Sequence, residues 1–176
     1  MSTEQIILGG GCFWCVEPVF SSIKGVVEVV PGYCGGHINN PSYHQVCTQN
    51  TGHVEVVRVS FNASKIGLKQ LLEVFFATHD PTTLNRQGAD VGPQYASVIF
   101  YTKMEQIATI NNVLNEVKNL LSDPVVTRVE EAKTFWVAEH EHHEYYLNNP
   151  YQGYCQVVIE PKLMEFRKRF ANLIKA

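Results

Sequence analysis

The hydrophobic patterns along the chain follow one another in an order that indicates its fold class. The first six regular segments are expected as strand, helix, strand, strand, helix and strand, an order that matches the ferredoxin-like split β-α-β arrangement. We therefore expect an α+β fold, a ferredoxin-like β-α-β-β-α-β sandwich core with additional C-terminal elements, as one domain over residues 1–176. The expected segments are 5–9, 15–23, 26–31, 53–61, 68–78 and 95–101, followed by 104–121, 125–130, 138–147 and 161–174.

Composition and charge exclude several classes of protein. The chain has 176 residues, 45% of them hydrophobic, and a formal net charge of -3, which fits one domain with a core and gives no basic surface for nucleic acid. The apolar run Ile6–Leu8 is too short for a signal peptide or a membrane span, so we expect a cytoplasmic protein with no membrane partner. An odd number of cysteines, five, in a reducing compartment favours thiols, ligands or catalysts over structural disulfides.

Two long segments without periodicity, 31–52 and 79–94, are expected to form the walls of a site. Connections of this length in a compact domain are usually functional or disordered. Both contain aromatic and acidic residues in place of a Ser/Gly filler.

The glycine-rich segment before Cys12 is the strongest chemical signal. Gly9–Gly11 allow a sharp turn, and Cys12 comes just before the helix expected from about Cys15. The positive end of a helix favours a thiolate and lowers a cysteine pKa from about 8.5 toward 7 or below. A buried, purely packing cysteine is the alternative, although a glycine-rich turn is a poor core position. Phe13 and Trp14 are either core residues or an apolar cup for a small group.

Other cysteine and histidine patterns leave two alternative functions open. Cys12 and Cys15 form a Cys-x-x-Cys, which a general thiol–disulfide oxidoreductase would use for dithiol exchange. The segment His140–Glu144 nearly matches the zinc-protease helix motif, but its fifth residue is glutamate instead of histidine. We interpret His140 and His143 as solvated residues of an amphipathic helix, with a metal-binding module as the non-enzymatic alternative and no metal expected.

Taken together, the motifs resemble those of the peptide-methionine (S)-S-oxide reductases, the methionine sulfoxide reductase A family. The resemblance runs in the family's order over nearly the whole chain. It is carried by Gly11-Cys12-Phe13-Trp14, Gly32-Tyr33-Cys34-Gly35-Gly36, Asn40-Pro41-Ser42-Tyr43, Val46-Cys47, Thr51-Gly52-His53-Val54-Glu55, His79-Asp80-Pro81-Thr82, the run from Arg86 to Tyr95, and Asn149-Pro150 before Gly153-Tyr154-Cys155.

The resemblance implies a single catalytic domain without a cofactor that reduces methionine S-sulfoxide, free or in proteins. A sulfoxide needs a nucleophile for its sulfur and an acid for its oxygen. The resemblance assigns attack to Cys12 and proton donation to Glu55. It assigns hydroxyl donation to Tyr43 and Tyr95, and a supporting polar role to Asp90. Phe13 and Trp14 are implied to grip the S-methyl group.

Recycling of the oxidised enzyme is also implied by the resemblance. Attack leaves Cys12 as a sulfenic acid, which a resolving cysteine converts to an intramolecular disulfide. The family pattern favours Cys155 as that residue and thioredoxin as the reductant that follows, in a role of protein repair after oxidative damage. Cys15, Cys34 and Cys47 remain alternative resolving or relay thiols at this stage.

Overall fold

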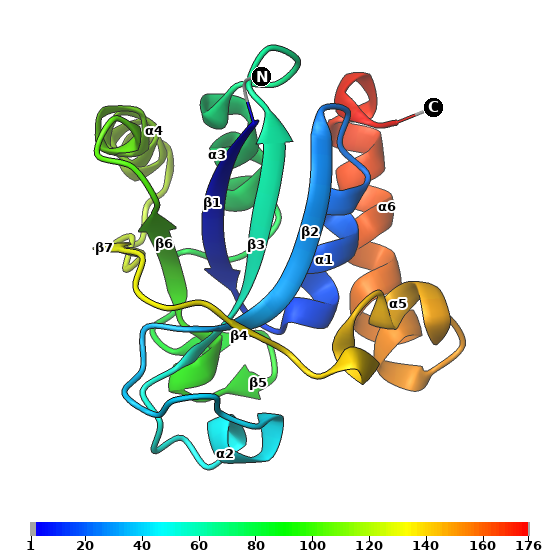
Figure 1. Cartoon of the computed structure of the whole chain (residues 1–176). Coiled ribbons are helices and arrows are strands. Elements are labelled where there is room, and N and C mark those ends of the chain that lie inside the picture. The colour runs from blue at the N-terminus through cyan, green and yellow to red at the C-terminus, as the bar shows by residue number, and fades with distance from the viewer. Residues whose placement is uncertain (1–2, 176) are drawn as a thin grey trace.

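A six-stranded sheet forms the centre of the computed structural model, which describes residues 3–175 (Figure 1). Its strands are β1 (Thr3–Gly10), β2 (Val26–Cys34), β3 (Val54–Asn62), β6 (Ser97–Tyr101), β7 (Arg128–Glu131) and β8 (Trp136–Val137). They lie in the order β7-β6-β1-β3-β2-β8, and every neighbouring pair is antiparallel except β6 and β7. A separate two-stranded sheet pairs β4 (Arg86–Gln87) with β5 (Asp90–Val91). The fold is therefore mixed α/β.

The α-helices lie around the large sheet. They are α1 (Phe13–Ser21), α2 (Tyr43–Cys47), α3 (Leu68–Ala77), α4 (Gln106–Leu120), α5 (Tyr145–Asn148) and α6 (Glu160–Arg169). Short 3-10 turns lie at Pro93–Tyr95, His140–His142 and Ala171–Leu173, and a π-helical segment at Cys155–Ile159 precedes α6. In Figure 1, α1 and α3 lie behind the sheet, α6 lies beside α1, and α4 flanks the β6 edge. The site is built where β1 meets α1.

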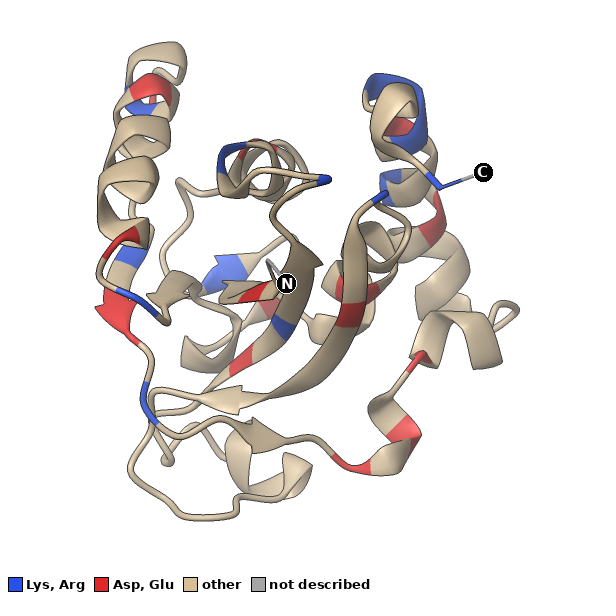
Figure 2. Cartoon of the chain, turned by 45° about the horizontal axis from the view of Figure 1, so that its top comes forward, with Lys and Arg blue, Asp and Glu red and all other residues tan. Residues whose placement is uncertain are grey.

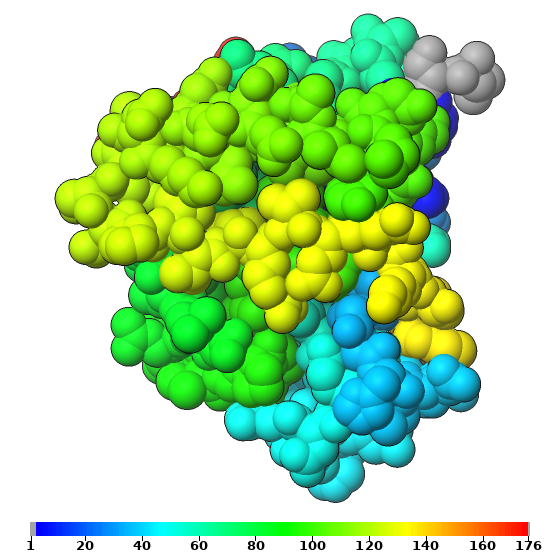
Figure 3. All heavy atoms as spheres, turned by 90° about the vertical axis from the view of Figure 1, so that its left-hand side faces the viewer, coloured from blue at the N-terminus to red at the C-terminus, as the bar shows by residue number. Residues whose placement is uncertain are grey.

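The central strand β3 is buried on both faces. Val57, Val59 and Phe61 join the core between sheet and helices. Val54 and Val56 join a smaller cluster on the opposite face, under the segment that follows β7. Figure 3 shows that segment in yellow, running between α4 and the loops coloured green and cyan. Glu55 therefore points to the helical side, among apolar neighbours.

The prediction of one helix over residues 138–147 is wrong. The chain forms a 3-10 turn at His140–His142 and then the four-residue helix α5. Glu144 between them has a φ of 53°, and a residue in this left-handed region cannot continue a right-handed helix. The interpretation of His140 and His143 as residues of an amphipathic helix is therefore wrong as well.

Two other helix boundaries differ from the expected ones. The carbonyl of Cys12 accepts hydrogen bonds from the amides of Cys15 and Val16, so α1 begins at Phe13 and Pro18 lies inside the helix, beyond its first turn. The last helix ends at Arg169, and a 3-10 turn follows.

Charge is dispersed over the molecule, except for basic residues that gather in the last turn of α6 (Figure 2). These residues, Arg167–Arg169, are exposed. No helix within residues 3–175 is both long and apolar enough to cross a membrane.

Candidate active site

Cys12 lies at the turn between β1 and α1, as the residue immediately before the helix. Gly11 makes the turn possible: its φ is 99°, and a Cβ there would be 2.8 Å from Cγ of Gln87. Cys12 is 7% exposed, so the thiol is more enclosed than a glycine-rich turn suggests. Its surroundings include Glu55, Cys15 and the backbone amide of Trp14.

Glu55 is completely buried on β3 and points toward the start of α1. Its Oε1 accepts a hydrogen bond of 3.2 Å from the amide nitrogen of Phe13, whereas Oε2 has no partner among residues 3–175. Burial raises the pKa of Glu55 to about 8, and the charge of Asp90 acts in the same direction. Glu55 is therefore a neutral acid near pH 7 with one oxygen free.

Tyr43 comes from the irregular segment 31–52, Tyr95 directly follows the irregular segment 79–94, and both lie close to this acid. Burial raises the pKa of both phenols, and the charge of Glu55 raises both further. A capping box fixes the helix that carries Tyr43: the amide of Gln45 donates to Oγ of Ser42, and the amide of Ser42 donates to Oε1 of Gln45. Both phenols keep their protons at any physiological pH and can act as hydrogen-bond donors.

Asp90, on β5, accepts a 2.6 Å hydrogen bond from the hydroxyl of Tyr154. The same hydroxyl lies 3.4 Å from Sγ of Cys15. Tyr154 thus connects the loop that carries Asp90 to the first turn of α1. The predicted polar residues Glu55, Tyr43, Tyr95 and Asp90 are all brought to the Cys12 end of α1.

The two aromatic residues after Cys12 belong to a cluster of rings. Phe13 is fully buried and packs on Tyr33 and Tyr43 at centroid distances of 5.7 and 6.3 Å. Trp14 is partly exposed and stacks on Tyr145 at 3.8 Å with an interplanar angle of 7°. Phe13 therefore belongs to the hydrophobic core beneath the site, while part of the Trp14 ring is exposed and can contact a ligand.

A second layer of residues orients this cluster, and sequence reasoning gave none of them a role. Nδ1 of the buried His142 accepts a 3.0 Å hydrogen bond from Nε1 of Trp14. Glu139 accepts from the Tyr33 hydroxyl at 2.9 Å and from the Tyr43 amide at 2.7 Å. One feature of the sequence could have indicated such a role. Glu139, His142 and Tyr145 lie in one short segment rich in polar aromatic residues.

The protonation of the thiols differs from the expectation of a thiolate at Cys12. Burial raises the pKa of Cys12 well above its usual value, the hydrogen bond to Cys15 and the charge of Glu55 add to this, and the Trp14 amide lowers it. The hydrogen bond from Cys12 lowers the pKa of Cys15 to about 7. The resting pair therefore favours the thiol at Cys12 and the thiolate at Cys15, because desolvation and the acid outweigh the effect of the helix end.

The remaining cysteines lie in different parts of the structure. Cys155 is fully buried at the start of the π-helical segment. Burial raises the pKa of its thiol, and the charge of Cys15 raises it further. Cys47 is partly exposed beside Tyr43. Cys34 lies in the small cluster on the opposite face of the sheet. All five cysteines are free thiols in the structure.

A comparison with known protein families covers nearly the whole chain. Residues 4–174 match the family model described as peptide methionine sulfoxide reductase. The chain belongs to this family. The peptide methionine sulfoxide reductase MsrA of Chromobacterium violaceum is 53% identical over 174 residues, covering 98% of this chain and 99% of that protein. The enzyme of the same name from Saccharolobus solfataricus is 48% identical over 172 residues, covering 98% and 97%.

Solved structures of family members have the same fold. Reduced Mxr1 from Saccharomyces cerevisiae superimposes with a TM-score of 0.81 at 32% identity, covering 88% of this chain and 90% of that one. Methionine sulfoxide reductase A of Corynebacterium diphtheriae gives a TM-score of 0.82 at 31% identity, covering 86% and 77%. The chain is an oxidoreductase that reduces methionine sulfoxide by cysteine chemistry, as the reductase family does.

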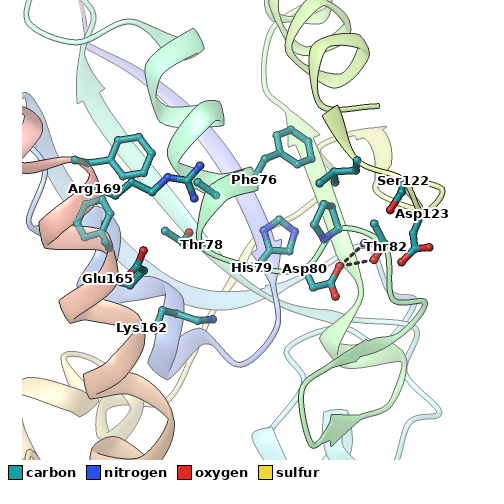
Figure 4. Close-up of a pocket in the computed structure, with 15 residues that line it drawn as sticks. Phe76, Thr78, His79, Asp80, Thr82, Ser122, Asp123, Lys162, Glu165 and Arg169 are labelled. Atoms are coloured by element: carbon teal, nitrogen blue, oxygen red, sulfur yellow. Dashed lines mark hydrogen bonds between the residues drawn. The ribbon is translucent and has the colours of Figure 1, made fainter. Parts of the chain in front are cut away.

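Other concave regions of the reductase lie away from these residues. A pocket of about 520 Å³ is formed by the loop after α3, the segment after α4 and α6, with Lys162, Arg169, His79 and Asp80 among its lining residues (Figure 4). None of the predicted site residues lines it. In the part of the chain that the structure describes, no group of three or more His, Cys, Asp or Glu side chains is arranged to hold a metal ion.

Proposed function

We propose that Cys12 attacks the sulfur of methionine sulfoxide while Glu55 protonates its oxygen. The observation that carries this assignment is the hydrogen bond from the Phe13 amide to Oε1 of Glu55, because it ties a neutral acid to the residue next to the nucleophile. The free Oε2 is available to give its proton to a substrate oxygen. A sulfoxide oxygen leaves poorly unless it is protonated, so the acid matters as much as the thiol.

The two sides of the substrate have different partners in this proposal. Tyr43 and Tyr95 donate hydrogen bonds to the oxygen, and Asp90 supports them through its effect on Glu55. Phe13 and Trp14 enclose the methyl group. A fixed methyl site and fixed oxygen donors define one hand at sulfur, so the reductase accepts the S-sulfoxide, free or in peptides and proteins.

The chemical step balances without a cofactor. The Cys12 thiol and the sulfoxide yield a sulfenic acid on Cys12 and a thioether, as the oxygen moves from the methionine sulfur to the cysteine sulfur. Cys12 loses two electrons and the methionine sulfur gains them.

Recycling then needs a second thiol and an external dithiol. We assign Cys155 as the resolving residue: its thiol condenses with the sulfenic acid, water leaves, and a Cys12–Cys155 disulfide forms. Cys155 begins a π-helical segment, a geometry that often occurs at functional sites, and that segment packs on α1. Thioredoxin is the proposed reductant; the yeast family member Mxr1 has been crystallised in complex with Trx2, a thioredoxin.

We also infer that the chain is a single catalytic domain built on a ferredoxin-like core. The order β6-β1-β3-β2, with antiparallel neighbours and with α1 and α3 as the connecting helices, supports this reading. One hydrophobic cluster contains residues from β1, α1, α3 and α6, which supports one domain.

Pure epimers and a cysteine variant test the proposal. Purified protein is incubated with dithiothreitol and either methionine S-sulfoxide or R-sulfoxide, and the methionine formed is measured. We expect turnover of the S epimer alone, lost in Cys12→Ser because a hydroxyl is a far weaker nucleophile than a thiolate. Cys34→Ser is the matched control, since that cysteine lies on the opposite face of the sheet. Substantial turnover by Cys12→Ser, or equal rates on both epimers, would refute the assignment.

A further inference from the structure

Gln87 is a half-buried amide side chain that has no part in the chemistry of the site. It lies on β4, and its side chain pairs with the backbone of Asp80, seven residues earlier in the chain. The amide nitrogen of Asp80 donates a hydrogen bond of 2.9 Å to Oε1 of Gln87, and Nε2 of Gln87 donates one to the carbonyl oxygen of Asp80. Both ends of the side-chain amide therefore bind the same residue of the irregular segment 79–94.

The backbone of Asp80 is a fixed point because His79, beside it in Figure 4, is bound to the core of the protein. Nδ1 of His79 donates a hydrogen bond of 2.5 Å to the carbonyl oxygen of Phe75 in α3, since a carbonyl can only accept. The neutral ring then accepts, at Nε2, a hydrogen bond of 2.8 Å from Oγ of Ser97 in β6. Burial lowers the pKa of His79 to about 4, so the ring stays neutral at pH 7.

The same two side chains pack against the turn that carries the nucleophile. A Cβ on Gly10 would lie 3.2 Å from Cγ of His79, and a Cβ on Gly11 would lie 2.8 Å from Cγ of Gln87. Gly11 directly precedes Cys12. Gln87 therefore lies between the fixed backbone of the irregular segment and the residue before the nucleophile.

Gln87 is also the neighbour of Asp90 across the β4–β5 hairpin. Side chains of directly paired residues in an antiparallel ladder lie on the same face. Asp90 accepts the 2.6 Å hydrogen bond from the hydroxyl of Tyr154, which lies 3.4 Å from Sγ of Cys15 in α1. Because the two residues are paired, a displacement of Gln87 carries Asp90 with it and disturbs this contact.

We propose that Gln87 is a positioning residue for sulfoxide reduction, whose amide holds the β4–β5 hairpin on the backbone of Asp80 and so sets the position of Asp90 beside the turn that carries Cys12. Asp90 supports the acid of the site, and a hairpin that moves away from the turn withdraws that support. Loss of the amide therefore slows the chemical step through Asp90. This inference rests on the proposed role of Asp90, and Gln87 acts without touching the substrate.

Gln87→Met separates the hydrogen bonds of this side chain from its packing. Methionine keeps Cβ and Cγ against Gly11, but its thioether cannot donate to the Asp80 carbonyl and accepts only weakly from the Asp80 amide. Gln70→Met is the matched control. Oε1 of the exposed Gln70 accepts a hydrogen bond of 3.1 Å from the amide of Gly67 at the start of α3, whereas Asp80 follows the other end of that helix.

A double-mutant cycle tests whether Gln87 acts through Asp90. Gln87→Met, Asp90→Asn, the double variant and Gln70→Met are compared in single turnover, with reduced protein in excess over a peptide containing methionine S-sulfoxide. We expect the rate to fall about 10–100-fold in Gln87→Met, the scale of loss when a catalytic group is misplaced. The double variant should be no more than about threefold slower than Asp90→Asn, since coupled residues do not give independent losses. Gln70→Met should match the wild type.

Amide hydrogen exchange tests the contact without turnover. We expect peptides that cover residues 80–91 to exchange faster in Gln87→Met than in the wild type and in Gln70→Met, because the hairpin has lost its attachment to Asp80. Gln87→Glu, which keeps the acceptor for the Asp80 amide and loses the donor, decides if Gln87→Met does not fold.

Each result decides the proposal. An unchanged single-turnover rate in Gln87→Met overturns it, and so do independent losses that multiply in the double variant. If the wild type reduces no sulfoxide, the proposed function fails. Faster exchange over residues 80–91 in Gln87→Met then still shows that Gln87 holds the hairpin, and unchanged exchange there overturns the inference on its own.

Discussion

The amide nitrogen of Phe13 donates a hydrogen bond of 3.2 Å to Oε1 of Glu55, across 42 residues of sequence. This contact joins the first turn of α1 to the middle of β3. It uses one oxygen of the carboxyl group and leaves the other for the substrate. The nucleophile and the acid are therefore fixed relative to each other by the backbone, before any substrate binds.

Replacement of Glu55 by glutamine tests the acid. Glutamine keeps a hydrogen-bond donor but has no transferable proton, so we expect the single-turnover rate of sulfoxide reduction to fall about 10²–10⁴-fold. In the wild type the rate should decline above about pH 8, where Glu55 ionises. A fall of less than a few-fold in Glu55→Gln would show that another group protonates the oxygen. Glu28→Gln, on the exposed part of β2, is the control.

Asp90→Asn tests the electrostatic coupling within the site. The negative charge of Asp90 raises the pKa of Glu55, so its removal lowers that pKa. We expect the alkaline limb of the pH–rate profile to move to lower pH in Asp90→Asn. Asp123→Asn, at an exposed residue after α4, should leave the limb in place. An unmoved limb in Asp90→Asn would mean that solvent screens the two carboxyl groups from each other.

The stability of the protein should depend on pH in the direction set by the raised pKa of Glu55. Between the ordinary value of 4.5 and about 8, the unfolded chain loses this proton while the folded chain keeps it. The folded state then binds more protons, so the free energy of unfolding falls as pH rises through this window. Glu17, with a pKa raised to about 7, acts in the same direction.

Glu55→Gln removes the larger of these contributions. Thermal unfolding of the wild type and of Glu55→Gln, measured between about pH 5 and pH 8, should show the variant gaining stability relative to the wild type as pH rises. A constant difference across this range would contradict the raised pKa in the folded state.

The recycling thiol is tested with serine variants. We expect Cys155→Ser to complete one stoichiometric turnover per protein and to lose cycling supported by thioredoxin, because thioredoxin reduces a disulfide by thiolate exchange. Cys15→Ser should keep both. Mass spectrometry of the sulfoxide-oxidised wild type should find a Cys12–Cys155 link. A dominant Cys12–Cys15 link would instead assign the resolving role to the cysteine that hydrogen-bonds with Cys12.

Two features of the site depend on local sequence pattern and could be predicted from it. The alternation of residues 53–61 puts Glu55 on the same strand face as Val57 and Val59, and the glycines before Cys12 predict a sharp turn ahead of the helix. Both follow from neighbouring residues, since side-chain direction in a strand has a period of two and Gly11 adopts a φ that other residues avoid.

The chemical environment of those residues depends on contacts between distant segments. The burial of Cys12 and the opposing charge of Glu55 raise a thiol pKa that the helix end alone would lower. The left-handed Glu144 ends a helix that periodicity predicts, and so brings His142 and Tyr145 to Trp14. Desolvation and long-range hydrogen bonds arise between segments far apart in the chain, and no local pattern encodes which segments will meet.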